Sequence, residues 1–121
     1  MKNFILIFAI LYLSTPIFSQ NVNITFELDP VYLGNNISPN GLYLGHHIGF
    51  GFPGDLQLTD SDGDGIYSIV ITKPKGFSSH YTFLNGDCSD WTCKENISGL
   101  PCADPNNYND RWLSPVQSDT G

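Results

Sequence analysis

Trp91 lies in the stretch of the chain whose residue types most directly indicate binding chemistry. The segment around it is rich in Asn, Asp, Gly and Cys, and Asn85 and Asp90 are among its polar neighbours. Proteins hold sugars by stacking an aromatic ring on the apolar face of a pyranose, while amide and carboxylate groups bind the hydroxyls. Trp91, Asn85 and Asp90 therefore predict a carbohydrate-binding site.

Two further aromatic residues, Phe50 and Phe52, lie in a glycine-punctuated segment, residues 48–54. This composition predicts an exposed loop and not core, so either ring is a candidate second platform for a sugar. The alternative is that the large rings plug the open end of a small core. We leave both alternatives open for Trp91 and expect the core position for Trp112.

An acidic motif, Asp60-x-Asp62-x-Asp64-Gly, matches the first half of a calcium-binding loop. Alternate carboxylates can point at one hard cation, and glycine permits the sharp bend. In that register the position of the bidentate glutamate falls on Ile71, within a predicted strand. A calcium site at Asp60, Asp62 and Asp64 and a solvated acidic turn both remain open.

Catalytic patterns are weak in this chain. His46 and His47 are adjacent, which in a strand places them on opposite faces, and His80 is distant in sequence, so no zinc site is predicted. Glu27 and Glu95 are a minor candidate for the paired carboxylates of a glycoside hydrolase. Nucleophilic motifs such as Gly-x-Ser-x-Gly are absent from the sequence. We expect a protein that is not an enzyme and needs no cofactor beyond possible calcium.

Three cysteines, Cys88, Cys93 and Cys102, lie close together near the end of the chain. In an exported protein this spacing favours one local disulfide over a metal site, and the pairing stays open. The remaining thiol predicts a partner in another chain or beyond Gly121. We therefore expect a fragment, or a domain that is followed by others.

The chain begins with Lys2 and a short apolar run, too short to span a bilayer but typical of a secretory signal. Residues 1–19 are thus a predicted signal peptide, and residues 20–121 form one domain of about a hundred residues. The formal net charge of the whole chain is −7. Loss of Lys2 makes it one unit more negative, which disfavours nucleic acid and anionic membranes as partners. We expect a secreted or cell-surface protein.

The predicted elements are short strands separated by turn-forming residues. Residues 22–29 alternate apolar and polar side chains, and residues 66–72 are mostly β-branched or aromatic. Val70 interrupts the polar face of the latter run, which predicts a central strand. The other expected strands are 41–46, 55–59, 79–85 and 111–116, and residues 86–109 are an ordered loop. This pattern predicts an all-β sandwich of six to seven antiparallel strands.

The order of motifs resembles the starch- and glycogen-binding-like modules, which are immunoglobulin-like sandwiches. The resemblance rests on five features: Gly-Leu-Tyr-Leu-Gly (41–45), Leu-Thr-Asp-Ser-Asp-Gly-Asp-Gly-Ile-Tyr (58–67), Lys-Pro-Lys-Gly (73–76), Tyr-Thr-Phe-Leu-Asn-Gly (81–86) and Trp91. The closing run of residues 93–111 is similar to a cysteine-containing subgroup of secreted modules.

This resemblance implies that Trp91 is a sugar-stacking residue. Phe50 or Phe52 is nearest to the position of a second stacking Trp, and Thr82 stands where glycogen-binding members have Lys. The implied function is non-catalytic binding of a polysaccharide similar to an α-glucan. Two alternatives are a calcium-stabilised structural or adhesive module and an accessory domain of a longer secreted enzyme.

Overall fold

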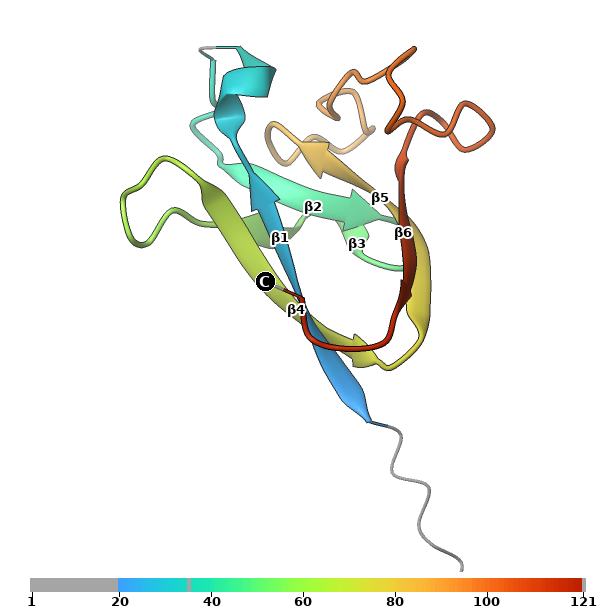
Figure 1. Cartoon of the computed structure of the whole chain (residues 1–121). Helices are drawn as coiled ribbons and strands as arrows, with labels where there is room; N and C mark the ends of the chain where they lie inside the picture. Colours follow the sequence, from blue (N-terminus) through green and yellow to red (C-terminus); the bar gives the residue numbers. More distant parts are fainter. Residues whose placement is uncertain (1–19, 35, 121) are drawn as a thin grey trace, which may run out of the picture.

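A computed structural model describes residues 20–34 and 36–120, which form six strands and one short 3-10 helix (Figure 1). The predicted signal peptide, residues 1–19, lies outside the described residues. The elements in chain order are β1 (Asn21–Leu28), η1 (Pro30–Leu33), β2 (Leu42–His46), β3 (Gly51–Leu58), β4 (Tyr67–Pro74), β5 (Phe77–Leu84) and β6 (Arg111–Val116).

The strands form two antiparallel sheets. β1 and β4 make a sheet of two strands, in which Ile24 lies opposite Ile71. The other sheet has four strands in the order β3-β2-β5-β6, and Leu44 of β2 lies opposite Phe83 of β5. Two sheets that bury their apolar faces against each other form a sandwich. The predicted all-β sandwich is therefore confirmed.

The core is built from the inward faces of both sheets. Alternate residues of β1 are buried as the sequence predicts, and burial of each such side chain contributes roughly 1.5 to 3 kcal/mol. The sheets meet through one cluster of buried apolar residues: Val22, Ile24, Phe26, Leu28, Leu42, Leu44, Phe50, Leu58, Phe83 and Val116.

The predicted exposed loop at residues 48–54 is wrong for Phe50, which is buried, and for residues 51–54, which belong to β3. Gly51 adopts φ 77°, a conformation that glycine tolerates, and β3 begins there. Phe50, just before it, is 2% exposed and packs edge-on against Phe26 with ring centroids 5.3 Å apart. Phe50 is thus a core residue and not a sugar platform, whereas Phe52 is 59% exposed.

The prediction of a central strand at residues 66–72 is also wrong. In the part of the chain that the structure describes, β4 pairs with β1 in a sheet of two strands. Val70 lies opposite Thr25 on the outer face of this sheet and is 58% exposed. The acidic turn predicted before this strand is confirmed, since Thr59 and Ser68 bridge its two ends with hydrogen bonds of 2.9 Å.

After β6 the chain crosses from the four-stranded sheet to the edge of β1 (Figure 1). The backbone N–H of Asn23 donates to Asp119 Oδ1 at 2.8 Å, and the N–H of Thr120 donates to the Asn23 carbonyl at 3.0 Å.

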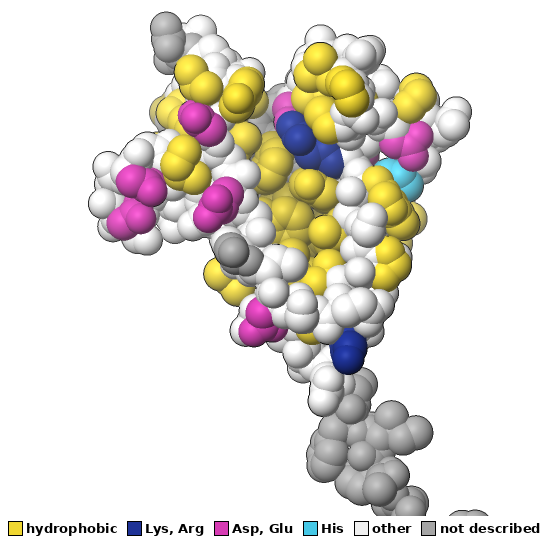
Figure 2. All heavy atoms as spheres, viewed as in Figure 1, with side chains coloured by type: hydrophobic (Ala, Val, Ile, Leu, Met, Phe, Trp, Pro, Cys, Tyr) yellow, Lys and Arg dark blue, Asp and Glu magenta, His cyan; other side chains and the backbone are white. Residues whose placement is uncertain are grey.

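Figure 2 shows hydrophobic side chains in a hollow between the two sheets on the side in view. Within residues 20–34 and 36–120, no helix is long and apolar enough to cross a membrane.

The different positions of two neighbouring phenylalanines give a matched test of this fold. We expect Phe50→Ala to lower the free energy of unfolding by about 3 to 5 kcal/mol, because it leaves a cavity in the core. Phe52→Ala is the control and should change stability by less than about 0.5 kcal/mol, because the ring is largely exposed. Equal losses in denaturant unfolding of the two variants would contradict the core position of Phe50.

Candidate functional site

A cavity of about 350 Å³ lies where the β5–β6 loop, residues 85–110, meets the end of β2. β2 ends at His46, which lines the cavity together with the next residue, His47. The loop contributes the other lining side chains, which are Trp91, Lys94, Tyr108 and Asp110. The cavity thus combines aromatic rings with a few groups that form hydrogen bonds, as ligand sites commonly do.

The position of Trp91 is fixed by a small closed loop. A disulfide joins Cys88 to Cys93. Inside it, the carboxylate of Asp90 accepts hydrogen bonds from the Thr92 N–H at 3.2 Å and from the Thr92 hydroxyl at 2.6 Å. Trp91 has φ 65°, a left-handed conformation that is unfavourable for a residue with a large side chain. The disulfide and the Asp90 turn hold the backbone in this conformation.

Gly45 of β2 makes room for the indole ring. A Cβ atom at position 45 would lie 3.2 Å from Trp91 Cζ3 and 2.7 Å from Leu84 Cδ1. The absence of a side chain at Gly45 therefore lets Trp91 approach the backbone of β2. Phe52 of β3 is next to it, with ring centroids 6.2 Å apart.

Lys94 links two other residues that line the cavity, Tyr108 and Asp110. Its Nζ donates to the carbonyl of Tyr108 and forms an ion pair with Asp110, whose side chain is only 8% exposed. Tyr108 has φ 56° and is 81% exposed. Three non-glycine residues in the described ranges have positive φ, and Trp91 and Tyr108 are the two that line the cavity. Strained backbone of this kind clusters at functional sites.

His46 forms a buried, polar part of the cavity wall. The residue is 8% exposed, and within the described residues its Nδ1 is buried without a hydrogen-bond partner. Its Nε2 lies 4.0 Å from Asp110 Oδ2, which is too long for a hydrogen bond. Burial, followed by the nearby His47, lowers the pKa of His46 below its usual value. The structure therefore favours a neutral imidazole at this position.

A partly buried ion pair between Arg111 and Glu95 anchors the β5–β6 loop. Arg111, at the start of β6, donates from Nε to Glu95 Oε1 at 2.7 Å and from Nη2 to Oε2 at 2.8 Å. These bonds raise the pKa of Arg111 above its ordinary value. Glu95 also accepts from the Phe83 N–H of β5 at 3.2 Å. Glu95 thus has a structural role, and Glu27, its suggested catalytic partner, is exposed on β1.

The structure brings together two of the five residues predicted to bind carbohydrate, Trp91 and Phe52. The side chains of the two predicted polar ligands bind the protein itself. Asn85 Oδ1 accepts from the Ser38 N–H at 2.7 Å, and Asp90 supports the Thr92 turn. Phe50, the fifth, lies in the core. The structure therefore places the aromatic pair side by side, whereas the side chains of Asn85 and Asp90 form hydrogen bonds within the protein.

Sequence reasoning missed five cavity residues: His46, His47, Lys94, Tyr108 and Asp110. The two histidines were expected on opposite faces, but their ring centroids are 4.9 Å apart. The pairing of β2 with β3 shifts register between Leu44 and His46, and the chain turns after His46, so the alternation of a strand no longer applies. Adjacent histidines at a strand end were the available signal.

Comparisons with known proteins found no match: no family model, curated protein or solved structure matches the chain.

The prediction of one local disulfide among the three cysteines is confirmed. Cys88 and Cys93 form the expected local disulfide, which indicates a protein of a non-cytosolic compartment. Cys102 is exposed and unpaired among the described residues.

Trp112, predicted as core, is instead 51% exposed on β6 because its side chain lies opposite His80 on the outer face of the sheet.

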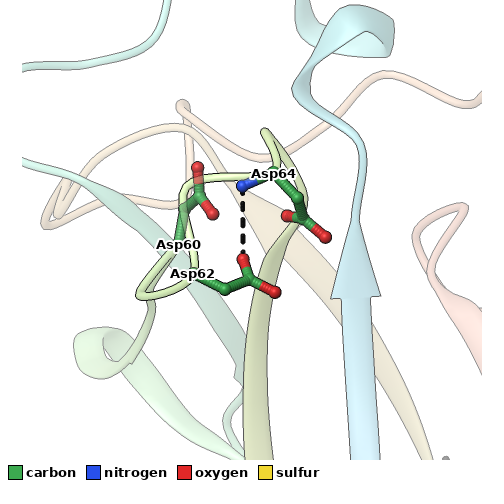
Figure 3. Close-up of side chains that lie close together, drawn as sticks. All are labelled: Asp60, Asp62 and Asp64. Carbon is green, nitrogen blue, oxygen red and sulfur yellow. Dashed lines mark hydrogen bonds between the residues drawn. The ribbon is translucent and has the colours of Figure 1, made fainter.

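The acidic turn is a second candidate site, separate from the cavity, and brings three carboxylates together (Figure 3). Oxygen atoms of Asp60, Asp62 and Asp64 lie within 4.8 Å of one another. Asp62 Oδ1 accepts from the Asp64 N–H at 3.3 Å, and Asp60 Oδ2 accepts from the Gly65 N–H at 3.0 Å. In the described chain Asp60 Oδ1 is buried and has no hydrogen-bond partner. Carboxylate oxygens are the ligands that Ca²⁺ prefers.

The environment of His46 predicts a pH-dependent stability. A histidine whose pKa is lowered by folding stabilises the protein fully above its unfolded pKa of about 6.5, and this contribution is lost as the pH falls toward the folded value. We expect the melting temperature of the wild type to fall more between neutral and mildly acidic pH than that of His46→Gln.

The matched control for this prediction is His47→Gln, because His47 is adjacent and exposed. Because burial is the larger cause of the lowered His46 pKa and the charge of His47 is the next, this variant should keep most of the pH dependence of the wild type and lose only the part due to His47. An NMR titration that gives the His46 imidazole a pKa at or above its usual value would contradict the proposed environment.

Proposed function

We propose that this protein is a non-catalytic module that binds an uncharged polysaccharide or oligosaccharide, of α-glucan type, in the cavity beside Trp91. The observation that carries the proposal is the pair of aromatic residues, Trp91 and Tyr108, which line the cavity on left-handed backbone. A conformation of this kind costs of order 1 to 3 kcal/mol and persists where the surrounding structure holds it. Here it presents two rings to one cavity.

The lining of the cavity has the mixed chemistry that a sugar requires. The rings of Trp91 and Tyr108 offer faces for the C–H groups of a pyranose. His47, Lys94 and Asp110 offer donors and acceptors for hydroxyl groups on the same wall. Phe52, exposed and next to Trp91, extends the aromatic surface toward β3.

Two features favour binding over catalysis. Among the residues that line the cavity, Asp110 is the one carboxylate, and it is already paired with Lys94. Hydrolysis of a glycosidic bond by the common mechanisms requires two carboxyl groups about 5 to 10 Å apart on either side of the bond. A single paired carboxylate instead fits recognition of hydroxyl groups. The formal net charge of −7 favours an uncharged glycan over an anionic one.

The compartment follows from the same proposal. The apolar run after Lys2 is typical of a secretory signal, and the Cys88–Cys93 disulfide requires oxidising surroundings. We assign the protein to the exported fraction, secreted or at the cell surface, where polysaccharides are available. A role as accessory domain of a longer secreted enzyme is compatible with the same binding site.

A second candidate function is calcium binding at the acidic turn, in a structural or adhesive module. The observation that favours it is the approach of oxygen atoms from Asp60, Asp62 and Asp64 to within 4.8 Å of one another. The buried, unpartnered Oδ1 of Asp60 supports it, because a buried carboxylate oxygen without a partner is costly. The two functions use different parts of the molecule and are compatible.

Substitution of Trp91 tests the main proposal. We expect Trp91→Ala to abolish binding to insoluble glucan in a pull-down assay and to remove the change in tryptophan fluorescence on titration with maltoheptaose. The control is Tyr32→Ala, which removes an 86% exposed aromatic ring outside the cavity and should leave binding unchanged.

Stability measurements on the same variants separate a binding role from a packing role. If Trp91→Ala lowers the free energy of unfolding by about 3 to 5 kcal/mol, the residue belongs to the core and the proposal loses its main group. Retained glucan binding by a folded Trp91→Ala variant would contradict it equally.

Calcium titration tests the second candidate. At a concentration about a hundredfold above the dissociation constant, bound calcium should stabilise the wild type by about 2.7 kcal/mol, with a higher melting temperature. Asp62→Asn should remove this effect. Glu27→Gln, which removes one exposed negative charge on β1, should keep it. A melting temperature of the wild type that does not respond to calcium would exclude the site.

A further inference from the structure

The aromatic rings near the cavity belong to a longer series, which we call the aromatic belt: Phe52, Trp91, His47, His46, His80 and Trp112. Its contacts are continuous on the side of β6, where the ring centroids of His80 and Trp112 are 4.7 Å apart and those of His46 and His80 are 6.0 Å apart. Trp91 lines the same cavity as His46, and its ring centroid is 6.2 Å from that of Phe52.

The order of the belt follows the order of the strands. Phe52 is on β3, His46 ends β2, His80 is on β5 and Trp112 is on β6. These strands are neighbours in the sequence β3-β2-β5-β6, and His80 pairs directly with Trp112. The belt therefore crosses the four-stranded sheet from one edge to the other, with the Trp91 cavity along its course.

Exposure differs along the belt, since His47 is exposed and the side chain of His80, between His46 and Trp112, is only 18% exposed. The terminal rings, Phe52 and Trp112, are 59% and 51% exposed, whereas His46 at the cavity is 8% exposed. Each edge strand of the four-stranded sheet thus carries one large exposed aromatic residue. These two residues give the belt two open ends, which suits a ligand longer than the cavity.

The end of the belt at Trp112 has its own fixed polar groups. His80 Nε2 lies 2.9 Å from Asp104 Oδ2, so the imidazole is oriented beside the indole. Asp104 also accepts from the Asn106 N–H at 3.0 Å and from Asn107 Nδ2 at 2.9 Å. The hydrogen bond from His80, followed by these bonds, lowers the pKa of Asp104 below its usual value. An ionised acceptor is thus held next to the stacked pair of rings.

We propose that the aromatic belt is an extended binding surface on which an uncharged oligosaccharide chain lies across the strands. The Trp91 cavity holds one sugar residue, and Trp112 with His80 and Asp104 forms a separate subsite for a residue further along the chain. The proposal rests on the carbohydrate-binding function given above. It extends that function in two ways. The oligosaccharide would lie across the strands of the sheet, and its affinity would depend on its length.

Three observations favour an oligosaccharide as the occupant. The exposed rings of Phe52 and Trp112 at the two ends of the belt offer faces on which sugar residues can stack. Hydrogen-bonding groups alternate with the rings, since Lys94 and Asp110 are at the cavity and Asp104 is beside His80. An acidic chain with a net charge of −7 disfavours an anionic ligand.

The test compares ligands of two lengths on the wild type and on Trp112→Ala, with Trp112→Phe as the matched control. Isothermal titration calorimetry with maltotriose and maltoheptaose, and with cellotriose and cellohexaose in parallel, gives the affinity of each. In the wild type we expect the longer ligand of the preferred series to bind at least about tenfold tighter. Trp112→Ala should keep the affinity for the short ligand and lose this gain, and Trp112→Phe should retain most of it.

The outcomes separate the belt from the underlying function. Equal affinity of the wild type for short and long ligands, or an unchanged length dependence in Trp112→Ala, would overturn the belt while Trp91-dependent binding stands. No binding of any saccharide by the wild type would overturn both. The other occupant to test is a second copy of the chain, and sedimentation velocity measures the oligomeric state. A wild-type dimer that Trp112→Ala converts to a monomer would overturn the proposal, because the belt would then be a dimer interface.

Discussion

The ion pair between Glu95 and Arg111 is the interaction on which the β5–β6 loop and its cavity depend. It joins the middle of the β5–β6 loop to the first residue of β6, and the bond from the Phe83 N–H ties the same carboxylate to β5. Both groups are largely withdrawn from solvent, with Glu95 8% exposed. Loss of one partner from such a pair leaves an uncompensated buried charge and costs roughly 3 to 5 kcal/mol. The loop can therefore be long and irregular and still hold Trp91, Lys94 and Asp110 in one place.

The strands were largely predictable from the sequence because their determinants are local. The alternation of residues 22–29 specifies β1, since every second side chain is apolar and a slip by one residue would expose all of them. β3 was only half predicted. Its first residues are glycines and aromatics, and the strand begins through the left-handed φ of Gly51 and the burial of Phe50 against β1. That packing partner is far away in the sequence, so composition alone gave an exposed loop.

The site was predictable to a smaller degree for the same reason. Trp91 was recognisable because its neighbours are polar and its segment is bounded by cysteines. Of the polar residues close to it in sequence, Asn85 bonds to Ser38 in the segment before β2, and Asp90 bonds to Thr92 within the loop. The groups that reach the cavity, His46 and Asp110, come from more distant segments. The residues adjacent to Trp91 in the sequence therefore differ from the residues that surround it in the cavity, which depend on the tertiary fold.

The left-handed backbone of Trp91 and Tyr108 has a consequence for the thermodynamics of recognition. Both residues are constrained during folding, by the Cys88–Cys93 disulfide and by Lys94. Ordering a flexible loop or a rotamer-rich side chain on association opposes binding by about 0.5 to 1.5 kcal/mol per side chain. In the binding proposed above, the backbone of both residues is already ordered by folding, so this part of the cost does not arise on association. A small interface with two such rings can then bind as tightly as a larger surface whose loops must become ordered on contact.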